Sequence, residues 1–338
     1  MTKITIFGAG ITGMAIASQL AKDYEVTIVA RDLPDDTPSQ QWSSPWACAG
    51  WVALGGSPAE QQMQLDSLAY CLRLAKTHPE SSVRAVELTD IYDVGATEAK
   101  ELWYYNCVPG FQELDTSQLT GDQKPTLAVK YTSFVLSPKP FLAWLRCRLE
   151  SSGVTFERIP TAKSLGELSR FGHDILINAS GLASTTLADV EDKKMISDRT
   201  YTILVKSDYN KAFVRRGATE YTYIFGRHDG TTVVGGISEP PENEVMAKDS
   251  VRTNLLYRAN LNLPKDFPSA EVNEYNIVED LQGIRPLRLP GVRVEQEVID
   301  GQMVVHAYGT TAGGYIYSFG LAREVAKLVD KFVFDLSI

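Results

Sequence analysis

The stretch Lys3-Ile-Thr-Ile-Phe-Gly8-Ala9-Gly10-Ile11-Thr12-Gly13-Met14 decides the fold of this 338-residue chain. Residues 3–7 are apolar and rich in β-branched side chains, which predicts a buried strand, and residues 14–21 are good helix formers. Residues 25–30 predict a second strand. A strand, a helix and a strand in this order form a βαβ unit, and such crossovers build parallel sheets. We therefore expect an α/β fold that begins with a Rossmann-like unit.

The segment Gly8-Ala9-Gly10-Ile11-Thr12-Gly13 has the G-x-G-x-x-G spacing of dinucleotide-binding turns. Glycine permits the tight turn and a close approach of the backbone to a ligand, while the free N–H groups of the following helix attract a pyrophosphate. A glycine-rich turn without a ligand would show the same letters. The position between a strand and a helix favours the nucleotide site, because the motif works only in that context.

The end of the second predicted strand is compatible with two different nucleotide cofactors. An acidic side chain at this strand tip accepts hydrogen bonds from a free ribose, whereas arginine suits the 2′-phosphate of NADP. This chain has both residue types, Arg31 followed by Asp32. NADP and FAD are therefore equal candidates on this pattern, and Arg31 could also be a solvated loop charge.

Composition and charge exclude several classes of partner. The net charge of −9 repels polyanions, so we expect no nucleic-acid ligand. The four cysteines are widely spaced and the four histidines form no ligand pattern, so neither a metal site nor a disulfide framework is expected. No apolar run reaches membrane-spanning length, and the N-terminus lacks a signal-peptide pattern. We expect a cytoplasmic or peroxisomal protein, although residues 335–338 are not a peroxisomal tripeptide.

The rest of the chain predicts a second lobe and a return to the first. The expected elements are helices at 59–77, 138–151 and 318–331 and strands at 174–178, 201–206, 221–225, 231–234 and 303–307. The three strands between 201 and 234 fit an antiparallel sheet. The nucleotide-binding lobe is therefore expected to be assembled from the start, middle and end of the chain.

Two further segments could meet a charged ligand. Arg285 and Arg288 flank a proline-stiffened segment, and arginine is a natural receptor for a carboxylate because it donates two parallel charged hydrogen bonds. On this pattern alone a surface ion pair is the simpler explanation. The glycine-rich turn that runs from Tyr308 to Tyr315 could present backbone amides to an electron-rich ring edge, or it could be an ordinary turn.

Seven segments occur in the order found in one enzyme family. They are Gly8-Ala-Gly10-Ile-Thr-Gly13, Val29-Ala-Arg-Asp-Leu-Pro34, Ser44-Pro-Trp-Ala-Cys-Ala-Gly-Trp51, Asn178-Ala-Ser-Gly181, Tyr223-Ile-Phe225, Gly283-Ile-Arg285-Pro286 and Val305-His-Ala-Tyr-Gly309. In these segments the chain resembles the D-amino acid and D-aspartate oxidases, with the fungal D-amino acid oxidases most similar. The resemblance spans nearly the whole chain, and it moves the expected cofactor from NADP to FAD.

The resemblance implies a two-domain architecture and a set of site residues. A discontinuous Rossmann-like FAD-binding domain would comprise 1–50, 140–190 and 280–338, and an α+β substrate domain on a mostly antiparallel sheet would comprise 51–139 and 191–279. Arg285 would bind the substrate carboxylate, and the hydroxyl of Tyr223 would donate a hydrogen bond to the same group. The expected FAD contacts are Gly8, Ala9, Gly10, Ile11, Thr12, Gly13, Arg31, Asp32, Ser43, Ser44, Ala49, Gly50, Ile159, Ser180, Gly181, Thr311, Ala312, Gly313, Gly314, Tyr315 and Ile316.

The reaction implied by the resemblance needs no side-chain base. Hydride passes from the substrate α-carbon to flavin N5, O₂ reoxidises the flavin and yields H₂O₂, and the imine hydrolyses to a 2-oxo acid and ammonia. The flavin carries the redox chemistry, so the protein has to bind and orient. The implied partners are O₂ and a small molecule with a carboxylate, and a homodimer stays open, because relatives are often dimeric but no interface can be read from the sequence.

A few positions depart from the family pattern. Ser238 stands where fungal oxidases have tyrosine and D-aspartate oxidases have arginine, which weakens a D-aspartate assignment, although Arg216 falls where that branch can have another substrate-side arginine. Ile316 replaces a polar residue near the flavin, and Tyr201 stands near a usual Arg-Gly-Gln segment. The departures leave three competitors: a specialised oxidase of secondary metabolism, a flavin-binding protein without activity and, through Arg31, an NADP-dependent dehydrogenase.

Overall fold

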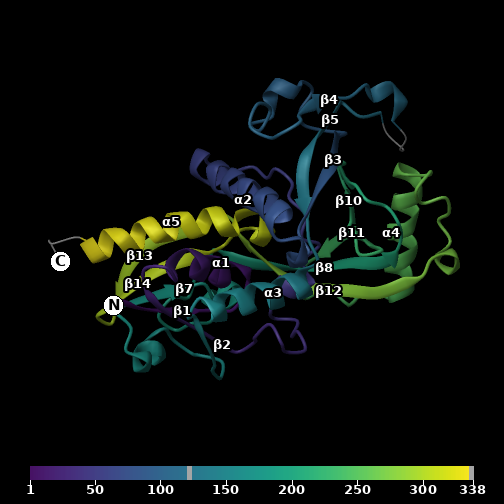
Figure 1. Cartoon of the computed structure of the whole chain (residues 1–338). Coiled ribbons are helices and arrows are strands. Elements are labelled where there is room, and N and C mark those ends of the chain that lie inside the picture. The colour runs from purple at the N-terminus through teal and green to yellow at the C-terminus, as the bar shows by residue number, and fades with distance from the viewer. Residues whose placement is uncertain (120–123, 335–338) are drawn as a thin grey trace.

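The computed structural model describes residues 1–119 and 124–334 and places the strands in two sheets (Figure 1). The six-stranded sheet has the order β13-β14-β7-β1-β2-β6. Its strands are β1 (Lys3–Phe7), β2 (Glu25–Ala30), β6 (Thr155–Arg158), β7 (Ile175–Asn178), β13 (Arg293–Ile299) and β14 (Gln302–Tyr308). All neighbours in it are parallel except β13 and β14. Residues 335–338, which bear on a peroxisomal signal, lie outside the described residues.

The predicted βαβ opening is confirmed. Strand β1 lies between β2 and β7, and Ile6 is opposite Ile28 on one side and Ile177 on the other. All three side chains are fully buried, as expected for a parallel sheet that is covered on both faces. Helix α1 (Ile11–Leu20) starts earlier than predicted, directly after its N-cap Gly10. The glycine turn is therefore the start of the helix itself.

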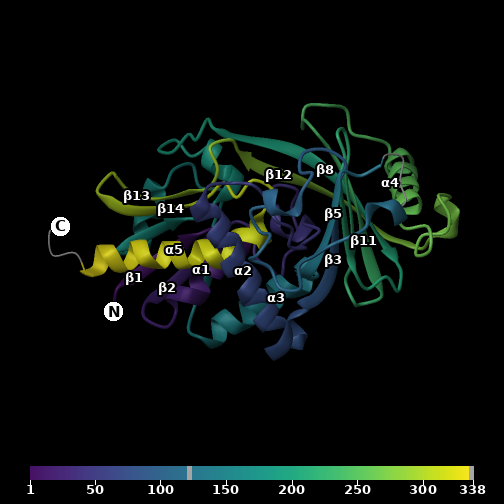
Figure 2. The same ribbon diagram turned by 90° about the horizontal axis from the view of Figure 1, so that it is seen from above.

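The eight-stranded sheet is mostly antiparallel, as predicted for the second lobe, and has the order β12-β8-β11-β10-β9-β3-β5-β4. Only β3 and β9 run parallel. The strands are β3 (Arg84–Tyr92), β4 (Gln112–Glu113), β5 (Leu127–Val135), β8 (Met195–Lys206), β9 (Ala212–Arg216), β10 (Tyr221–Gly226), β11 (Thr231–Glu239) and β12 (Ile277–Arg288). Helix α4 (Lys248–Asn262) covers one face of this sheet, away from the other helices (Figure 2).

Three further helices, α2 (Pro58–Thr77), α3 (Pro138–Ser151) and α5 (Gly314–Phe334), pack with α1 on the six-stranded sheet and toward the second lobe (Figure 2). The contact between α2 and α5 is a backbone contact. A Cβ atom on Gly320 would lie 2.0 Å from the carbonyl oxygen of Met63, and the N–H of Gly320 donates to Ser67 Oγ at 2.9 Å. Glycine is therefore required for the two helices to approach this closely.

Two parts of the architecture differ from the sequence prediction. Helix α4 was missed because its face toward the sheet is interrupted by polar residues, and β3 and β5 were missed as well. The segment of Arg285, expected to be stiffened by Pro286, is regular strand, and Pro286 pairs with Ser197 on β8. Strand β12 as a whole belongs to the eight-stranded sheet, whereas the expected boundary at residue 280 would divide it. The division into domains therefore stays a prediction.

Candidate functional site

One cavity of about 670 Å³ is lined by residues from both sheets. It begins at the β1–α1 turn and the end of β2 and extends to β8, β10 and β12. Most residues expected in the site line it, namely Gly8, Ala9, Gly10, Ile11, Thr12, Arg31, Asp32, Ser43, Ser44, Ala49, Gly50, Ser180, Gly181, Tyr223, Arg285, Ala312, Gly314, Tyr315 and Ile316. The structure therefore brings segments from the whole chain to a single space.

Four expected contacts lie outside the lining of this cavity. Gly13 faces the turn, since its Cβ would lie 1.9 Å from the carbonyl oxygen of Gly8. Ile159 packs into the hydrophobic core beside the sheet, while the three residues that follow it line the cavity. Thr311 Oγ hydrogen-bonds to the backbone of β12, and Gly313 faces a tyrosine ring of α5. The roles of these four residues as FAD contacts stay predictions.

The N-termini of two helices, α1 and α5, lie side by side at the glycine turn. Gly8 has φ of +121°, and a Cβ on it would lie 2.5 Å from the carbonyl oxygen of Ala179, so only glycine fits. A Cβ on Gly314, the first residue of α5, would lie 3.5 Å from Ile11 Cγ2, so the starts of α1 and α5 adjoin. Free N–H groups and the helix dipoles make this region attractive to an anion.

Arg31 is held within the chain and does not present a free receptor for a phosphate. Its Nε and Nη2 donate to Asp32 Oδ2 at 2.8 and 2.5 Å, and its remaining contacts are to Gln41 Oε1 at 2.5 Å and Ser39 Oγ at 3.2 Å. The Asp32 carboxylate lines the cavity and can accept from a ribose hydroxyl. This arrangement suits FAD better than the 2′-phosphate of NADP.

Tyr223 lies at the other end of the cavity, on β10. Its ring lies over the backbone of β11, since a Cβ on Gly235 or Gly236 would come within 2.6 Å of the ring or its hydroxyl. Phe225 stacks on it with ring centroids 5.6 Å apart. Burial raises the pKa of the Tyr223 phenol well above its usual value, although the nearby positive charge of Arg285 opposes this. Tyr223 is therefore a neutral hydrogen-bond donor at neutral pH.

Arg285, on β12, carries its charge into the same part of the cavity. Its Nη2 donates to Asp198 Oδ2 on the paired strand β8 at 2.7 Å, and its buried Nε has no partner within residues 1–119 and 124–334. Thr202 Oγ1 is also buried without a partner in that part of the chain and lines the cavity. An acceptor such as a carboxylate would satisfy these donors. The contact of Asp198 with Arg285 results from the pairing of β8 with β12, and no pattern in the sequence indicated it.

A second arginine, Arg216 at the end of β9, also lines the cavity. Its Nε and Nη2 donate to the two oxygens of Asp90 at 2.8 and 3.0 Å, and Asp90 is fully buried. The guanidinium lies over the rings of Tyr92 and Tyr221, at 5.0 and 5.9 Å. Most of the Arg216 charge is therefore compensated inside the protein before any ligand binds.

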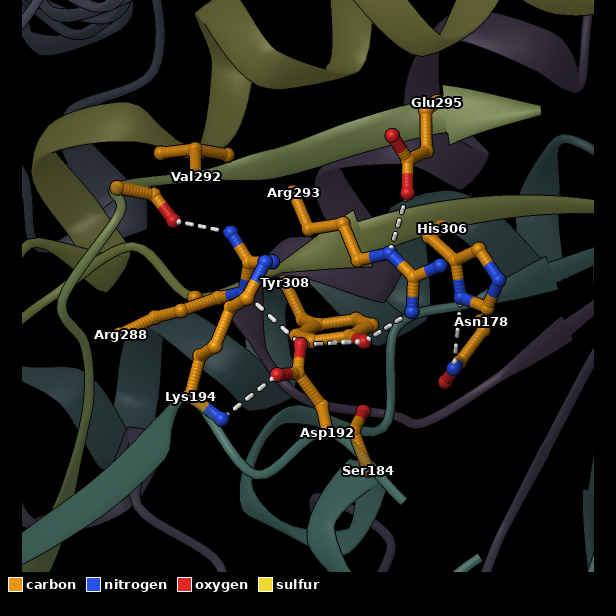
Figure 3. A network of polar contacts seen from close by, with 12 residues as sticks. Asn178, Ser184, Asp192, Lys194, Arg288, Val292, Arg293, Glu295, His306 and Tyr308 are labelled. Carbon is orange, nitrogen blue, oxygen red and sulfur yellow. Dashed lines mark hydrogen bonds and ion pairs between the residues drawn. The ribbon is translucent and has the colours of Figure 1, made fainter. Parts of the chain in front are cut away.

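A polar network supports the cavity wall from behind (Figure 3). Tyr308, which lines the cavity, donates to Asp192 Oδ2 at 2.9 Å, and Arg288 Nε donates to the same oxygen at 2.9 Å. Burial alone would raise the pKa of the Asp192 carboxyl, but hydrogen bonds from Arg288 and Tyr308 hold the pKa below its usual range. Arg288 is thus a structural residue that supports the wall of the cavity.

A second branch of the network leads to Ser180. His306 Nε2 lies 2.9 Å from Glu297 Oε2, and its Nδ1 lies 3.2 Å from Asn178 Nδ2. Asn178 Oδ1 accepts from Ser180 Oγ at 2.6 Å. Because the amide nitrogen of Asn178 is a donor, Nδ1 of His306 must be the acceptor, so this imidazole is neutral. His306 therefore helps to orient the Asn178 amide, which in turn binds Ser180 at the cavity.

The positions that depart from the family pattern differ in their placement. Tyr201 does not line the cavity, because its hydroxyl donates to Glu239 at 2.6 Å and accepts from the N–H of Met246 at 3.1 Å. Ser238 is exposed and also outside the lining. Ile316 does line the cavity, where it adds an apolar surface.

No histidine lines the cavity in the described part of the chain, and its carboxylate, Asp32, is paired with Arg31. Within residues 1–119 and 124–334, no group of three or more His, Cys, Asp or Glu side chains could hold a metal ion. In the same residues, no helix is long and apolar enough to cross a membrane.

A glycine turn at a parallel sheet, and a second sheet that closes the same cavity with an arginine and a tyrosine, define a dinucleotide-dependent oxidoreductase. Residues 3–328 match the model of a family described as FAD dependent oxidoreductase, and the chain belongs to this family. It is 27% identical to a D-amino-acid oxidase of Schizosaccharomyces pombe, over 96% of this chain and 95% of that protein. It is 28% identical to a D-aspartate oxidase of Talaromyces thermophilus, with 97% and 95% covered.

Among solved structures, glycine oxidase from Geobacillus kaustophilus has the same fold, with a TM-score of 0.76, 18% identity, and coverage of 100% of this chain and 98% of that one. The cofactor is FAD, and the cavity fits it. Its glycine turn leaves space for a pyrophosphate, Asp32 suits the ribose, and buried donors without partners face the lining. The protein is an FAD-dependent oxidoreductase that is similar to the D-amino acid oxidases.

Proposed function

We propose that the protein oxidises the Cα–N bond of D-amino acids to give a 2-oxo acid, ammonia and H₂O₂. The observation that carries this proposal is that Arg285 and Tyr223 line the same cavity as the glycine turn of the FAD site. The names of the relatives from S. pombe and T. thermophilus support the D-enantiomer.

Arg285 and Tyr223 would bind the substrate carboxylate from two sides. The Nε of Arg285, which has no partner among the described residues, is a charged donor, and the neutral phenol of Tyr223 is a second donor. Two charge-assisted hydrogen bonds fix the orientation of a carboxylate and therefore the position of the α-carbon attached to it. The contribution of these residues to the rate would be alignment.

When bound, FAD supplies the two-electron oxidation, with O₂ as the electron acceptor. The rest of the cavity would exclude water around the substrate, since Val52, Leu54, Phe225 and Ile316 give it an apolar lining. The described lining has no histidine and no carboxylate besides Asp32, which Arg31 already binds. A mechanism that needs no side-chain base agrees with this composition.

The presence of Arg216 in the cavity favours a second candidate, an acidic D-amino acid. An arginine could pair with a side-chain carboxylate of the substrate. Against this, Asp90 already binds two nitrogens of Arg216. We therefore expect the enzyme to prefer substrates with neutral side chains. Arg216 would then act as a hydrogen-bond donor without contributing a free charge.

The test is the visible spectrum of the purified holoenzyme under anaerobic conditions, recorded with matched D- and L-amino acids. Loss of the oxidised flavin absorption with D-enantiomers only is the expected result. Reduction by L-enantiomers only, or by none of a broad panel, would overturn the proposal. The pair D-aspartate and D-asparagine separates the two candidates, since they differ only in the side-chain charge, and a faster reduction by D-asparagine is expected.

A further inference from the structure

Trp42 carries a buried hydrogen-bond donor without an acceptor. The side chain is 8% exposed and lines the cavity. Its indole Nε1 has no hydrogen-bond partner in the part of the chain that the structure describes. Because a buried donor without an acceptor is costly, its presence points to a ligand that supplies one.

The nitrogen edge of the Trp42 indole faces the glycine turn. Apart from its chain neighbours Ala9 and Ile11, the side-chain atoms of the described residues that come within 4 Å of a Cβ position on Gly10 are Ser44 Oγ, at 3.0 Å, and Trp42 Nε1, at 3.8 Å. Gly10 is the N-cap of α1 and has no side chain to fill this space or to accept from the indole. The donor therefore faces the place where the helix N-terminus attracts an anion.

The loop that carries Trp42 is held in place by contacts on both sides. The N–H of Trp42 and the side chain of Arg31 both bond to Ser39, at 3.2 Å each. On the other side, Ser43 Oγ donates to the Ile284 carbonyl at 2.7 Å, and Ser44 Oγ accepts from an N–H at the start of α1. These contacts hold the loop before a ligand binds, and the Trp42 side chain packs in the hydrophobic core.

Two other tryptophans near Trp42 in the chain use their indole N–H inside the protein. Trp46 donates to the carbonyl of Ser39 at 2.8 Å, and Trp51 donates to the carbonyl of Gln64 at 3.0 Å. The free donor of Trp42 is therefore a property of its position over the turn.

We propose that the Trp42 indole N–H donates a hydrogen bond to a pyrophosphate oxygen of FAD, beside the N–H groups at the start of α1. The indole nitrogen is a donor only, so its partner must be an acceptor, and an anionic oxygen gives the stronger, charge-assisted bond. The loop over residues 39–46 is then part of the cofactor site, as a second element that contacts the phosphates besides the G-x-G-x-x-G turn.

The test compares ligands that do and do not carry the phosphates. The full-length chain, freed of flavin, is titrated with FAD, ADP and riboflavin, and Trp42→Phe is compared with the unmodified protein. We expect Trp42→Phe to raise the Kd for FAD and ADP about tenfold, the loss of one charge-assisted hydrogen bond, and to leave that for riboflavin unchanged. An unchanged Kd for ADP, or a loss confined to riboflavin, would overturn the proposal.

Trp51→Phe is the matched control, because Trp51 is fully buried, lies outside the cavity lining and already has an acceptor. This variant should lower the thermal midpoint of the flavin-free protein without changing the Kd for ADP. Trp42→Phe should show the opposite pattern, since it removes a donor that has no acceptor among the residues that the structure describes.

A measurement on the unmodified sequence keeps the proposal testable if Trp42→Phe does not fold. In protein labelled with ¹⁵N-tryptophan, addition of ADP should move one indole N–H proton signal strongly downfield, and this signal should persist in Trp46→Phe and Trp51→Phe. If no indole signal moves, the proposal is wrong.

Discussion

Arg285 is the residue on which substrate binding depends in our proposal. Removal of one partner from a buried, charged hydrogen-bond pair costs several kcal/mol, so we expect Arg285→Ala to raise KM at least about 100-fold while FAD stays bound. Steady-state kinetics and the flavin spectrum measure both. Tyr223→Phe is the milder companion, with an increase of about tenfold. An unchanged KM in Arg285→Ala would show that the carboxylate binds elsewhere.

Asp198 binds one nitrogen of Arg285, so the arginine interacts with an anion of the protein as well as with the substrate. Asp198→Asn should lower KM severalfold at unchanged kcat, because Arg285 would no longer be shared with an internal anion. Asp280→Asn is the control, since Asp280 pairs with Arg252 at 2.7 Å and lies outside the cavity lining. A higher KM in Asp198→Asn would instead mean that Asp198 holds Arg285 in position.

For single residues of the site, the sequence predicted those in the motifs but not the residues that contact them. Arg285 and Tyr223 stand in segments that resemble a known family, and the structure places both in one cavity. Asp198 contacts Arg285 only because β8 and β12 pair in one particular register. Register is decided by the folded sheet, and no local pattern in the sequence reveals such a cross-strand partner.

The close contact between α2 and α5 predicts a strong effect of a small substitution. Gly320→Ala would place a methyl group 2.0 Å from the Met63 carbonyl oxygen, so the helices must separate, at a cost of about 2 kcal/mol in the free energy of unfolding. Gly55→Ala is the control, because nothing lies within 4 Å of its Cβ position. Denaturant unfolding measures both, and equal stabilities would contradict the backbone contact.

The neutral His306 between β7 and β13 predicts a dependence of stability on pH. Burial lowers the pKa of its imidazole. In the unfolded chain histidine takes up a proton below a pH of about 6.5, and the folded protein takes it up only at lower pH. The free energy of unfolding should therefore fall as the pH drops below about 6.5, and this contribution should be constant above it.

The variant His306→Gln should reduce that slope in thermal or denaturant unfolding between pH 7 and 5. The exposed hairpin residue His228 provides the control, as His228→Asn, because asparagine tolerates its positive φ of 57°. An identical slope in His306→Gln and the unmodified protein would show that other groups determine the pH dependence.

Elements with strong local signals were predicted best. The predicted strand at 3–7 and the predicted helix at 138–151 agree with β1 and α3 at both ends, because a β-branched run and proline at a helix start act locally. Strands β3 and β5 were missed although their residues are typical of strands, whereas helix α4 has a weaker pattern because Arg258 and Asn262 interrupt its buried face. They are stabilised by packing in the eight-stranded sheet, a tertiary effect that periodicity does not show.

In the whole molecule, bound FAD should stabilise the two sheets as one unit, since residues of both sheets line its cavity. At a free FAD concentration of 100 times Kd, binding adds about 2.7 kcal/mol to the free energy of unfolding. Calorimetry with and without FAD should show a single transition that moves to higher temperature. Two transitions, of which only one responds to FAD, would show that the two lobes unfold independently.

The adjoining starts of α1 and α5 also bear on how the enzyme is made. During synthesis Ile11 leaves the ribosome well before Gly314, because nearly all strands of both sheets lie between them in the chain. The glycine turn therefore lacks its neighbour α5 until that helix is synthesised, and strands β13 and β14, which complete the six-stranded sheet, come shortly before it. We therefore expect the flavin to be captured only after α5 has been synthesised, so that the cellular supply of FAD acts after this step.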